Sequence, residues 1–196
     1  MKNNIATVKS YLLISVFWVL IGCNNADDEF YNSVFIEVPN LIEVETQSSY
    51  AVDDVLWINT NSFQRTLNEP GQLELLDIFA TTEADFFKFS YYLEKQNGSN
   101  WELVDPTGNL VNNLGTAVIL NGITGFSTLN KPINSIYEFK NGIKLTQTGN
   151  YRLTFFSSFR GQGVDIISEN APNKTYMIIT TTVVGINGNT YSFSVN

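Results

Sequence analysis

Few side chains in this sequence could carry out covalent chemistry. The 196-residue chain has no histidine and a single cysteine, Cys23. Without histidine, the usual Ser-His-Asp and Cys-His mechanisms and His-ligated zinc are excluded, and the commonest general base is missing. The remaining candidates for chemistry are the carboxylates and the lone thiol.

The carboxylates could support glycoside hydrolysis, which uses two Asp or Glu side chains on opposite sides of a cleft. Candidate residues are Asp53, Asp54, Asp77, Glu83 and Asp85. Their spacing singles out no pair, and acidic residues of this kind also occur as solvated surface. We therefore assign no catalytic residue and expect a non-catalytic protein, with a carboxylate-dependent glycan hydrolase as an alternative.

Oxygen-bearing residues also cluster in one loop, which contains Asp105, Asn109, Asn112 and Asn113. Calcium prefers oxygen ligands from such loops, but the spacing matches no EF-hand. Asp and Asn are in addition common turn formers, since their side chains hydrogen-bond nearby backbone. We expect a turn here, and we expect no metal and no cofactor.

The lone thiol lies at the end of an apolar segment. Lys2 and Lys9 precede an apolar run from Tyr11 to Ile21, and Cys23 follows it. A membrane span needs about 20 apolar residues, roughly twice this length. The layout is that of a secretory signal, with an uncleaved anchor as the alternative. A single cysteine in an exported chain cannot form an internal disulfide, and an exposed free thiol is reactive.

The residues Leu20, Ile21, Gly22 and Cys23 resemble a bacterial lipobox. This resemblance implies that the Cys23 thiol is alkylated by a diacylglyceryl group, that residues 1–22 are removed, and that the new amine is acylated. Two or more acyl chains give a stable membrane anchor, whereas one gives only marginal binding.

The acidic residues Asp27, Asp28 and Glu29 follow the cysteine closely. They resemble the export signal of surface lipoproteins of Bacteroidota, which implies an outer-membrane lipoprotein that faces the cell exterior. The other interpretation is a solvated linker, which is common for acids near a terminus. In either case residues 23–33 would form an acidic flexible linker, and residues 34–196 a single domain.

The charge balance limits the partners. The chain has 11 Lys and Arg against 19 Asp and Glu, a net charge of −8. Nucleic acid is excluded, because its binding depends on basic residues that neutralise phosphates. An anionic bilayer surface is disfavoured for the same reason. We therefore expect contact with the membrane only through the lipid anchor.

The rest of the chain has the period-two alternation of β-strands. In the clearest strand, 87–94, Phe87, Phe89, Tyr91 and Leu93 share one face. The segment 176–184 is almost continuously apolar and predicts one inner strand covered on both faces. Further strands are predicted at residues 34–38, 41–45, 55–59, 101–104, 117–120, 136–140, 143–146, 151–156, 164–168 and 190–195. Residues 70–79 predict a short helix, because Leu73, Leu76 and Phe79 are spaced by three.

Residues 143–153 sharpen the fold class. A strand ends at Leu145, a polar turn with Gly149 follows, and Tyr151 begins the next strand. This segment resembles the corner of immunoglobulin-like sandwiches, in which a tyrosine hydroxyl bonds back to the turn backbone. The dipeptide Asn141-Gly142 could be a hairpin turn or a kink within one strand, and we favour the kink. The prediction is an all-β, immunoglobulin-like antiparallel β-sandwich after a lipoprotein signal peptide.

Three residues are candidates for ligand contact. Trp57 and Trp101 could stack on sugar rings, and Arg160 lies in a Gly-rich segment that is typical of a loop tip. Loops on a rigid sandwich often carry binding. The predicted function is a lipid-anchored binding or accessory module of the cell envelope, with an envelope protein or an extracellular polymer as partner. The structural alternative is a pilin-like assembly subunit that exchanges a strand at an open sheet edge.

Overall fold

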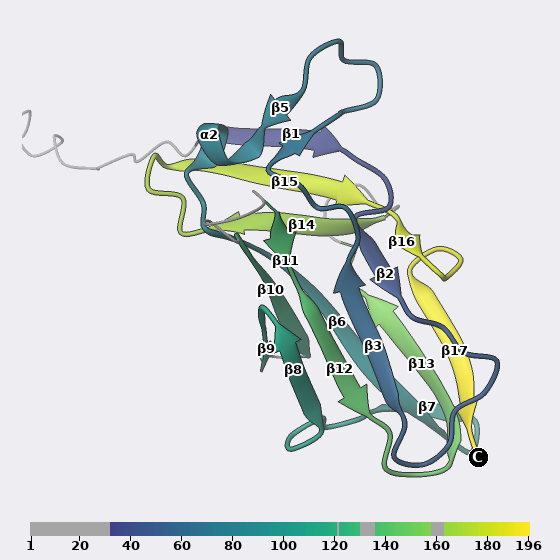
Figure 1. Ribbon diagram of the computed structural model, residues 1–196. Coiled ribbons are helices and arrows are strands. Elements are labelled where there is room, and N and C mark those ends of the chain that lie inside the picture. Colours follow the sequence, from purple (N-terminus) through teal and green to yellow (C-terminus); the bar gives the residue numbers. More distant parts are fainter. Residues whose placement is uncertain (1–31, 121, 130–135, 158–162) are drawn as a thin grey trace, which may run out of the picture. The chain divides into compact units, whose positions relative to one another are not determined.

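Strands form nearly all of the regular structure in a computed structural model of the protein (Figure 1), which describes residues 32–120, 122–129, 136–157 and 163–196. Ten strands form the larger sheet: β1 (Asn32–Glu37), β6 (Phe86–Asn97), β7 (Asn100–Leu103), β9 (Thr116–Ile119), β10 (Ile123–Leu129), β11 (Tyr137–Glu138), β13 (Gly149–Phe155), β14 (Val164–Glu169), β15 (Thr175–Thr181) and β17 (Thr190–Val195).

A second sheet has five strands in the order β16-β2-β3-β12-β8. These strands are β2 (Ile42–Val44), β3 (Val55–Thr60), β8 (Leu110–Leu114), β12 (Lys140–Lys144) and β16 (Val183–Val184). A small two-stranded sheet, β4 (Thr66–Leu67) and β5 (Leu76–Asp77), precedes the short helix α2 (Ile78–Thr82). Residues Tyr31–Asn196 form one compact unit.

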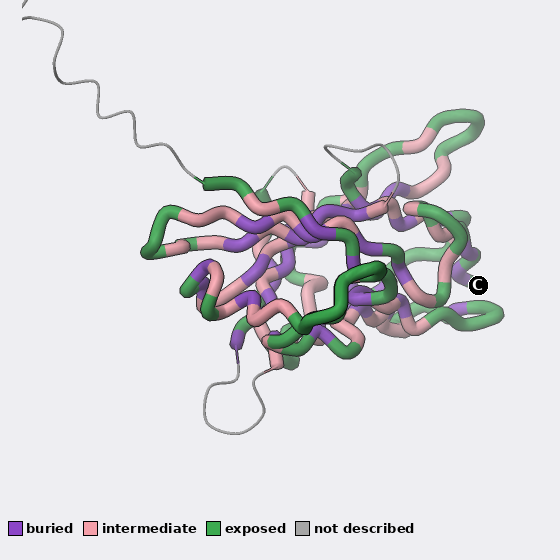
Figure 2. Tube along the Cα trace, turned by 90° about the horizontal axis from the view of Figure 1, so that it is seen from above, coloured by how far each residue is buried: buried purple, intermediate pink, exposed green. Residues whose placement is uncertain are grey.

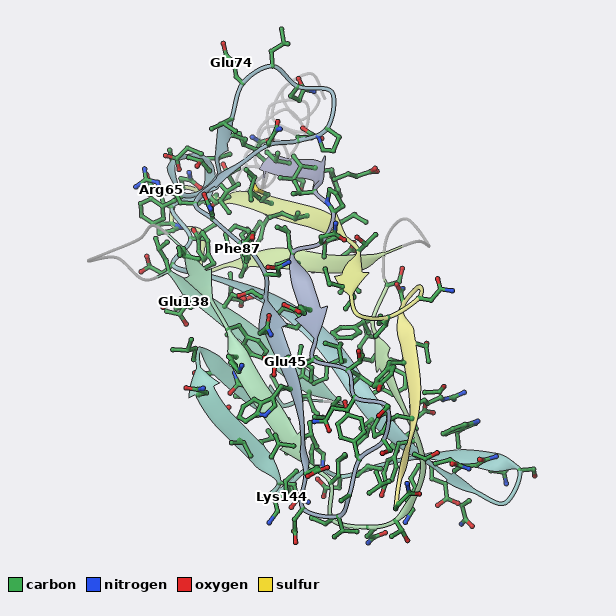
Figure 3. All side chains as sticks on the ribbon, turned by 45° about the vertical axis from the view of Figure 1, so that its right-hand side comes forward. Glu45, Arg65, Glu74, Phe87, Glu138 and Lys144 are labelled. Carbon is green, nitrogen blue, oxygen red and sulfur yellow. The ribbon has the colours of Figure 1, made fainter. Side chains whose placement is uncertain are left out.

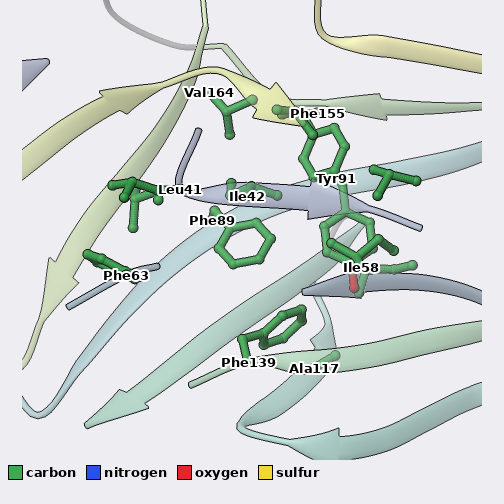
Figure 4. Packing of buried hydrophobic residues seen from close by; sticks show 14 of the residues in the cluster. Leu41, Ile42, Ile58, Phe63, Phe89, Tyr91, Ala117, Phe139, Phe155 and Val164 are labelled. Atoms are coloured by element: carbon green, nitrogen blue, oxygen red, sulfur yellow. The ribbon is translucent and has the colours of Figure 1, made fainter. Parts of the chain in front are cut away.

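The core lies between the two larger sheets (Figure 4). Phe87, Phe89 and Tyr91 of β6 point inward, as the alternation predicts, and the Phe89 ring meets Phe139 edge-on at 5.0 Å between centroids. Leu56 and Ile58 of β3 are also fully buried and belong to the same cluster. Buried residues alternate with half-buried ones along much of β6, β13 and β15, and Figure 2 shows purple and pink segments following each other along the trace. This arrangement confirms the predicted all-β sandwich.

The strand β6 organises the larger sheet, because it pairs with four others. One edge pairs with β10 and then with β7. The opposite edge pairs with β14 at residues 86–88 and with β13 at residues 91–95. Between these two pairings, at Phe89 and Ser90, neither strand pairs with β6. The sheet therefore divides along this edge, and the division matters for the site described below.

The predicted tyrosine corner is confirmed. The hydroxyl of Tyr151 donates a 2.8 Å hydrogen bond to the backbone carbonyl of Gln147, four residues earlier. The kink at Asn141-Gly142 is confirmed as well, since both residues lie inside β12 and the pairing with β8 shifts register between Lys140 and Asn141. The corner thus joins β12 of one sheet to β13 of the other.

Several details differ from the predictions. The sandwich is not purely antiparallel, because β1 pairs with β15 and β16 with β2 in parallel. The predicted strand 176–184 is two strands in different sheets, and β15 alternates between inward and outward side chains. The predicted helix 70–79 is wrong: residues 70–75 form a loop, and α2 begins only at Ile78. Finally, β1 begins at Asn32, so the last two residues of the predicted linker belong to a strand.

The proposed signal peptide, lipobox, Cys23 and acidic export signal all lie outside the described residues. In the described part of the chain, no helix has the length and apolar character needed to cross a bilayer.

Candidate functional site: an apolar groove on the larger sheet

An apolar groove opens on the outer face of the larger sheet, beside the unpaired stretch of β6. We call it the sheet groove, and its volume is about 340 Å³. Its walls come from β6, from the turn after β9, from the residue after β13, and from β14. The lining residues used below are Lys88, Ser90, Leu120, Phe156, Asp165 and Ile167.

The apolar wall consists of side chains that would be expected inside a core. Leu120 is 64% exposed and Phe156 is 44% exposed. Phe155 points into the core, so strand alternation turns Phe156 outward, where its ring packs against Tyr92 at 5.2 Å. The backbone N–H of Phe156 donates to the carbonyl of Ser90 over 2.9 Å, which fixes the chain at the unpaired edge of β6.

Gly122 shapes the turn that forms the Leu120 wall of the groove. The turn after β9 is closed by a hydrogen bond from the Leu120 N–H to the Gly122 carbonyl at 2.9 Å. Gly122 has a φ of +126°, which strongly favours glycine. A Cβ atom at this position would lie 3.2 Å from the Tyr91 carbonyl and 3.5 Å from the Phe156 ring. The positive φ and the nearby Tyr91 carbonyl therefore favour glycine directly after the groove wall that Leu120 forms.

The polar side chains of the groove form ion pairs or hydrogen bonds with neighbouring residues. Lys88 forms an ion pair with Glu169, and the Thr180 hydroxyl donates to the Asp165 carboxylate over 3.1 Å. The hydroxyls of Ser90 and Thr124 lie 3.1 Å apart. These contacts hold the polar atoms at fixed positions around an apolar surface. Pockets of this size and character, with a few placed polar groups, are typical of ligand-binding sites.

The two tryptophans proposed from the sequence do not share a site. Trp57 lies on β3 of the five-stranded sheet, and the Lys140 ammonium group is 5.5 Å from its ring centroid. Trp101 lies on β7 of the larger sheet, where the Arg152 guanidinium group stacks at 4.6 Å. Each ring therefore already contacts a cation of the chain, and neither lines the sheet groove. Arg160 lies outside the described residues.

Three of the five candidate carboxylates serve local structure. Asp53 pairs with Lys144 at 2.9 Å, and Asp54 accepts the Ala51 N–H at 2.8 Å. Asp77 caps α2, and its hydrogen bonds with the Arg65 guanidinium group hold its pKa below the usual range. These three carboxylates are therefore used to fix neighbouring backbone and side chains.

In the loop considered for calcium, the Thr107 hydroxyl and N–H both donate to Asp105 and lower its pKa. The expected turn is confirmed at residues 105–109, where the Asn109 N–H donates to the Pro106 carbonyl at 2.8 Å.

Asn112 and Asn113 are not part of this loop, because they lie in β8, which pairs with β12. Among the described residues, no group of three His, Cys, Asp or Glu side chains could hold a metal ion.

The residues of the sheet groove are missed by the sequence predictions for a simple reason. The segments 117–120, 151–156 and 164–168 read as ordinary strands, and an alternating pattern does not say which outward side chains meet. The consecutive pair Phe155-Phe156 is the one available signal, since a strand cannot bury both rings on the same face.

Comparisons with known proteins show no family. The sequence matches no protein-family model, and it matches no curated protein. Among solved structures, the chain is similar to a crystal structure of the human F-spondin reeler domain (fragment 1), with 11% sequence identity and a TM-score of 0.36. The match covers 89% of this chain and 100% of that one. At this TM-score we base no argument on the likeness.

Proposed function

We propose that this protein is a non-catalytic binding module of the cell envelope, held to the outer membrane by lipid on Cys23 and facing the cell exterior. The lipobox resemblance of residues 20–23 and the acidic residues 27–29 support the anchor and the location. The sheet groove supports the binding function. Its ligand is an amphipathic molecule outside the cell, or an amphipathic part of an extracellular polymer or envelope protein.

One observation carries the proposal: Leu120 and Phe156, which line the sheet groove, are exposed, although each would gain by being buried. Removal of apolar surface from water is worth roughly 25 cal/mol per Å². Binding of a ligand whose apolar part lies between Leu120, Phe156 and Ile167 would be favoured by this free energy. The Lys88–Glu169 pair would meet its polar end, beside the largely buried Asp165 of the groove lining.

The test is a fluorescence titration with N-phenyl-1-naphthylamine, a neutral apolar probe that brightens when water is excluded. We expect saturable binding by the wild-type protein. The double variant Leu120→Ser with Phe156→Ser should bind about tenfold more weakly, a loss near 1.4 kcal/mol.

Leu114→Ser is the matched control, because Leu114 is 43% exposed but lies on β8 of the other sheet. This variant should bind the probe like the wild type. Absence of saturable binding by the wild type, or equal losses in the control and the groove variant, would reject the groove as the binding site.

A further inference from the structure

The hairpin formed by β4, the loop 68–75 and β5 carries two leucines that contact no core. We call it the leucine hairpin. Leu73 is fully exposed and Leu75 is 65% exposed. In Figure 3 the neighbouring Glu74 lies at the tip of this loop, far from the sheets, and Arg65 lies near its base. Isolated exposed leucines are ordinary, but two on one projecting tip form a small apolar knob.

The base of the leucine hairpin is fixed. Thr66 pairs with Asp77 and Leu67 with Leu76, and the Leu67 side chain is buried. The Arg65 guanidinium group donates to both carboxylate oxygens of Asp77, with N–O distances of 2.7–2.9 Å.

The tip is shaped by a turn. The Gln72 N–H donates to the Glu69 carbonyl at 3.0 Å, and Gly71 supplies the φ of +89° that the turn requires. A knob on such a support loses less conformational entropy on binding than a free loop does.

The charge around the knob indicates what could cover it. Between Thr66 and Phe87 the chain has no Lys or Arg. Its charged residues are Glu69, Glu74, Glu83 and Asp85, together with Asp77, which pairs with Arg65 at the base of the hairpin. Complementary potentials favour association and exclude wrong partners. An anionic bilayer would repel these carboxylates. A second copy of this chain, at a net charge of −8, is opposed by the same repulsion.

We propose that the leucine hairpin docks into an apolar pocket, bordered by Lys or Arg side chains, on another protein. Leu73 and Leu75 would fill the pocket, and Glu69 and Glu74 would face its basic border. This surface lies on other elements than the sheet groove, and the inference does not depend on the groove.

The test is photocrosslinking of the full chain in the cells that naturally make it. The photoreactive residue p-benzoylphenylalanine replaces Gln72, which leaves both leucines in place. The control carries it at Ser99, which is exposed at the tip of the β6–β7 hairpin. We expect one protein adduct from position 72 and none from position 99, with the crosslinked peptide of the partner containing or adjoining Lys or Arg.

Two double variants test whether the adduct depends on the leucines and on the acidic residues. Leu73→Ser with Leu75→Ser should reduce the adduct by about tenfold or more, because the apolar contact is removed. Glu69→Lys with Glu74→Lys should reduce it by about fivefold or more through charge reversal. Leu73, Glu74 and Leu75 are exposed and Glu69 is half-buried, so the melting temperature of each variant is measured to check that the fold is kept.

The proposal is overturned by any of four results. These are no adduct from position 72, an adduct with the mass of a phospholipid, an adduct with a second copy of this chain, and a protein adduct that survives the leucine substitutions.

Discussion

The Tyr151 hydroxyl shows how a single atom ties a turn to the strand that follows it. Replacement by phenylalanine keeps the ring, which stacks on Phe193 at 5.7 Å, but removes the hydrogen bond to the Gln147 carbonyl. We expect Tyr151→Phe to lower the free energy of unfolding by about 0.5–1.5 kcal/mol.

Urea denaturation measures this difference. Tyr92→Phe is the matched control, because its hydroxyl has no hydrogen-bond partner among the described residues. Equal losses in the two variants would mean that the corner bond contributes nothing specific.

Gly142 permits close packing on the five-stranded sheet. A Cβ atom there would lie 2.2 Å from a methyl carbon of Val55 and 3.0 Å from the Trp57 ring. We expect Gly142→Ala to destabilise the fold by about 1–3 kcal/mol through overpacking. Adding Val55→Ala should recover part of this loss, because it removes the nearest atom. If the two substitutions are strictly additive in denaturation, Val55 is not the obstacle.

The tyrosine corner and the kink at Asn141-Gly142 could be predicted because each rests on residues close in sequence. The roles of Trp57 and Trp101 could not. The contacts that engage them, with Lys140 and Arg152, come from strands far along the chain and depend on cross-strand register. No spacing in the sequence shows that a cation will lie against a given ring.

At the scale of elements, the Arg65–Asp77 pair should make the base of the leucine hairpin sensitive to acid. The pKa of Asp77 is lowered in the folded state, mainly by hydrogen bonds from Arg65. A lowered pKa means that the charged carboxylate stabilises the fold above the unfolded pKa, near 3.9, and that this stabilisation is lost as the pH falls through the folded value.

The variant Asp77→Asn tests this. Asparagine can still cap α2 but carries no charge. We expect its melting temperature to be lower than that of the wild type by a few degrees at pH 7, and the difference to shrink steadily below about pH 4. A difference that stays constant across this range would show that the charge of Asp77 is not the cause.

The wrong helix prediction at 70–79 is instructive. The spacing of Leu73, Leu76 and Phe79 is helical, but Leu73 is exposed and the helix begins after the Asp77 cap. The turn at Pro70 and Gly71 and the pairing of β4 with β5 determine the local structure instead. Pairing between strands ten residues apart is a tertiary effect that side-chain periodicity does not report.

At the scale of the whole molecule, the sequence predicts the fold class but not the groove. Alternating strands and the corner motif indicate a sandwich. The sheet groove needs residues 88–90, 120, 156, 165 and 167 to meet where β13 and β14 separate along β6. The two strands separate because each pairs with a different part of the same edge of β6. A local sequence pattern does not encode this long-range pairing.

The proposed anchor makes a prediction for the complete chain. Cys23→Ala should abolish lipid attachment, since the thiol is the proposed acylation site. We expect the wild type to enter the detergent phase of a Triton X-114 partition and the variant to stay in the aqueous phase. Detergent partitioning of the variant equal to that of the wild type would contradict lipidation at Cys23.

Methyl NMR with the apolar probe tests the central claim, ligand binding in the sheet groove, most directly. On titration with N-phenyl-1-naphthylamine, the methyl signals of Leu120 and Ile167 should shift together and saturate, while those of Leu73, Leu103 and Leu114 stay in place. All three of these leucines are exposed and lie outside the groove. Shifts spread equally over the exposed leucines, or no shift at Leu120 and Ile167, would contradict the account.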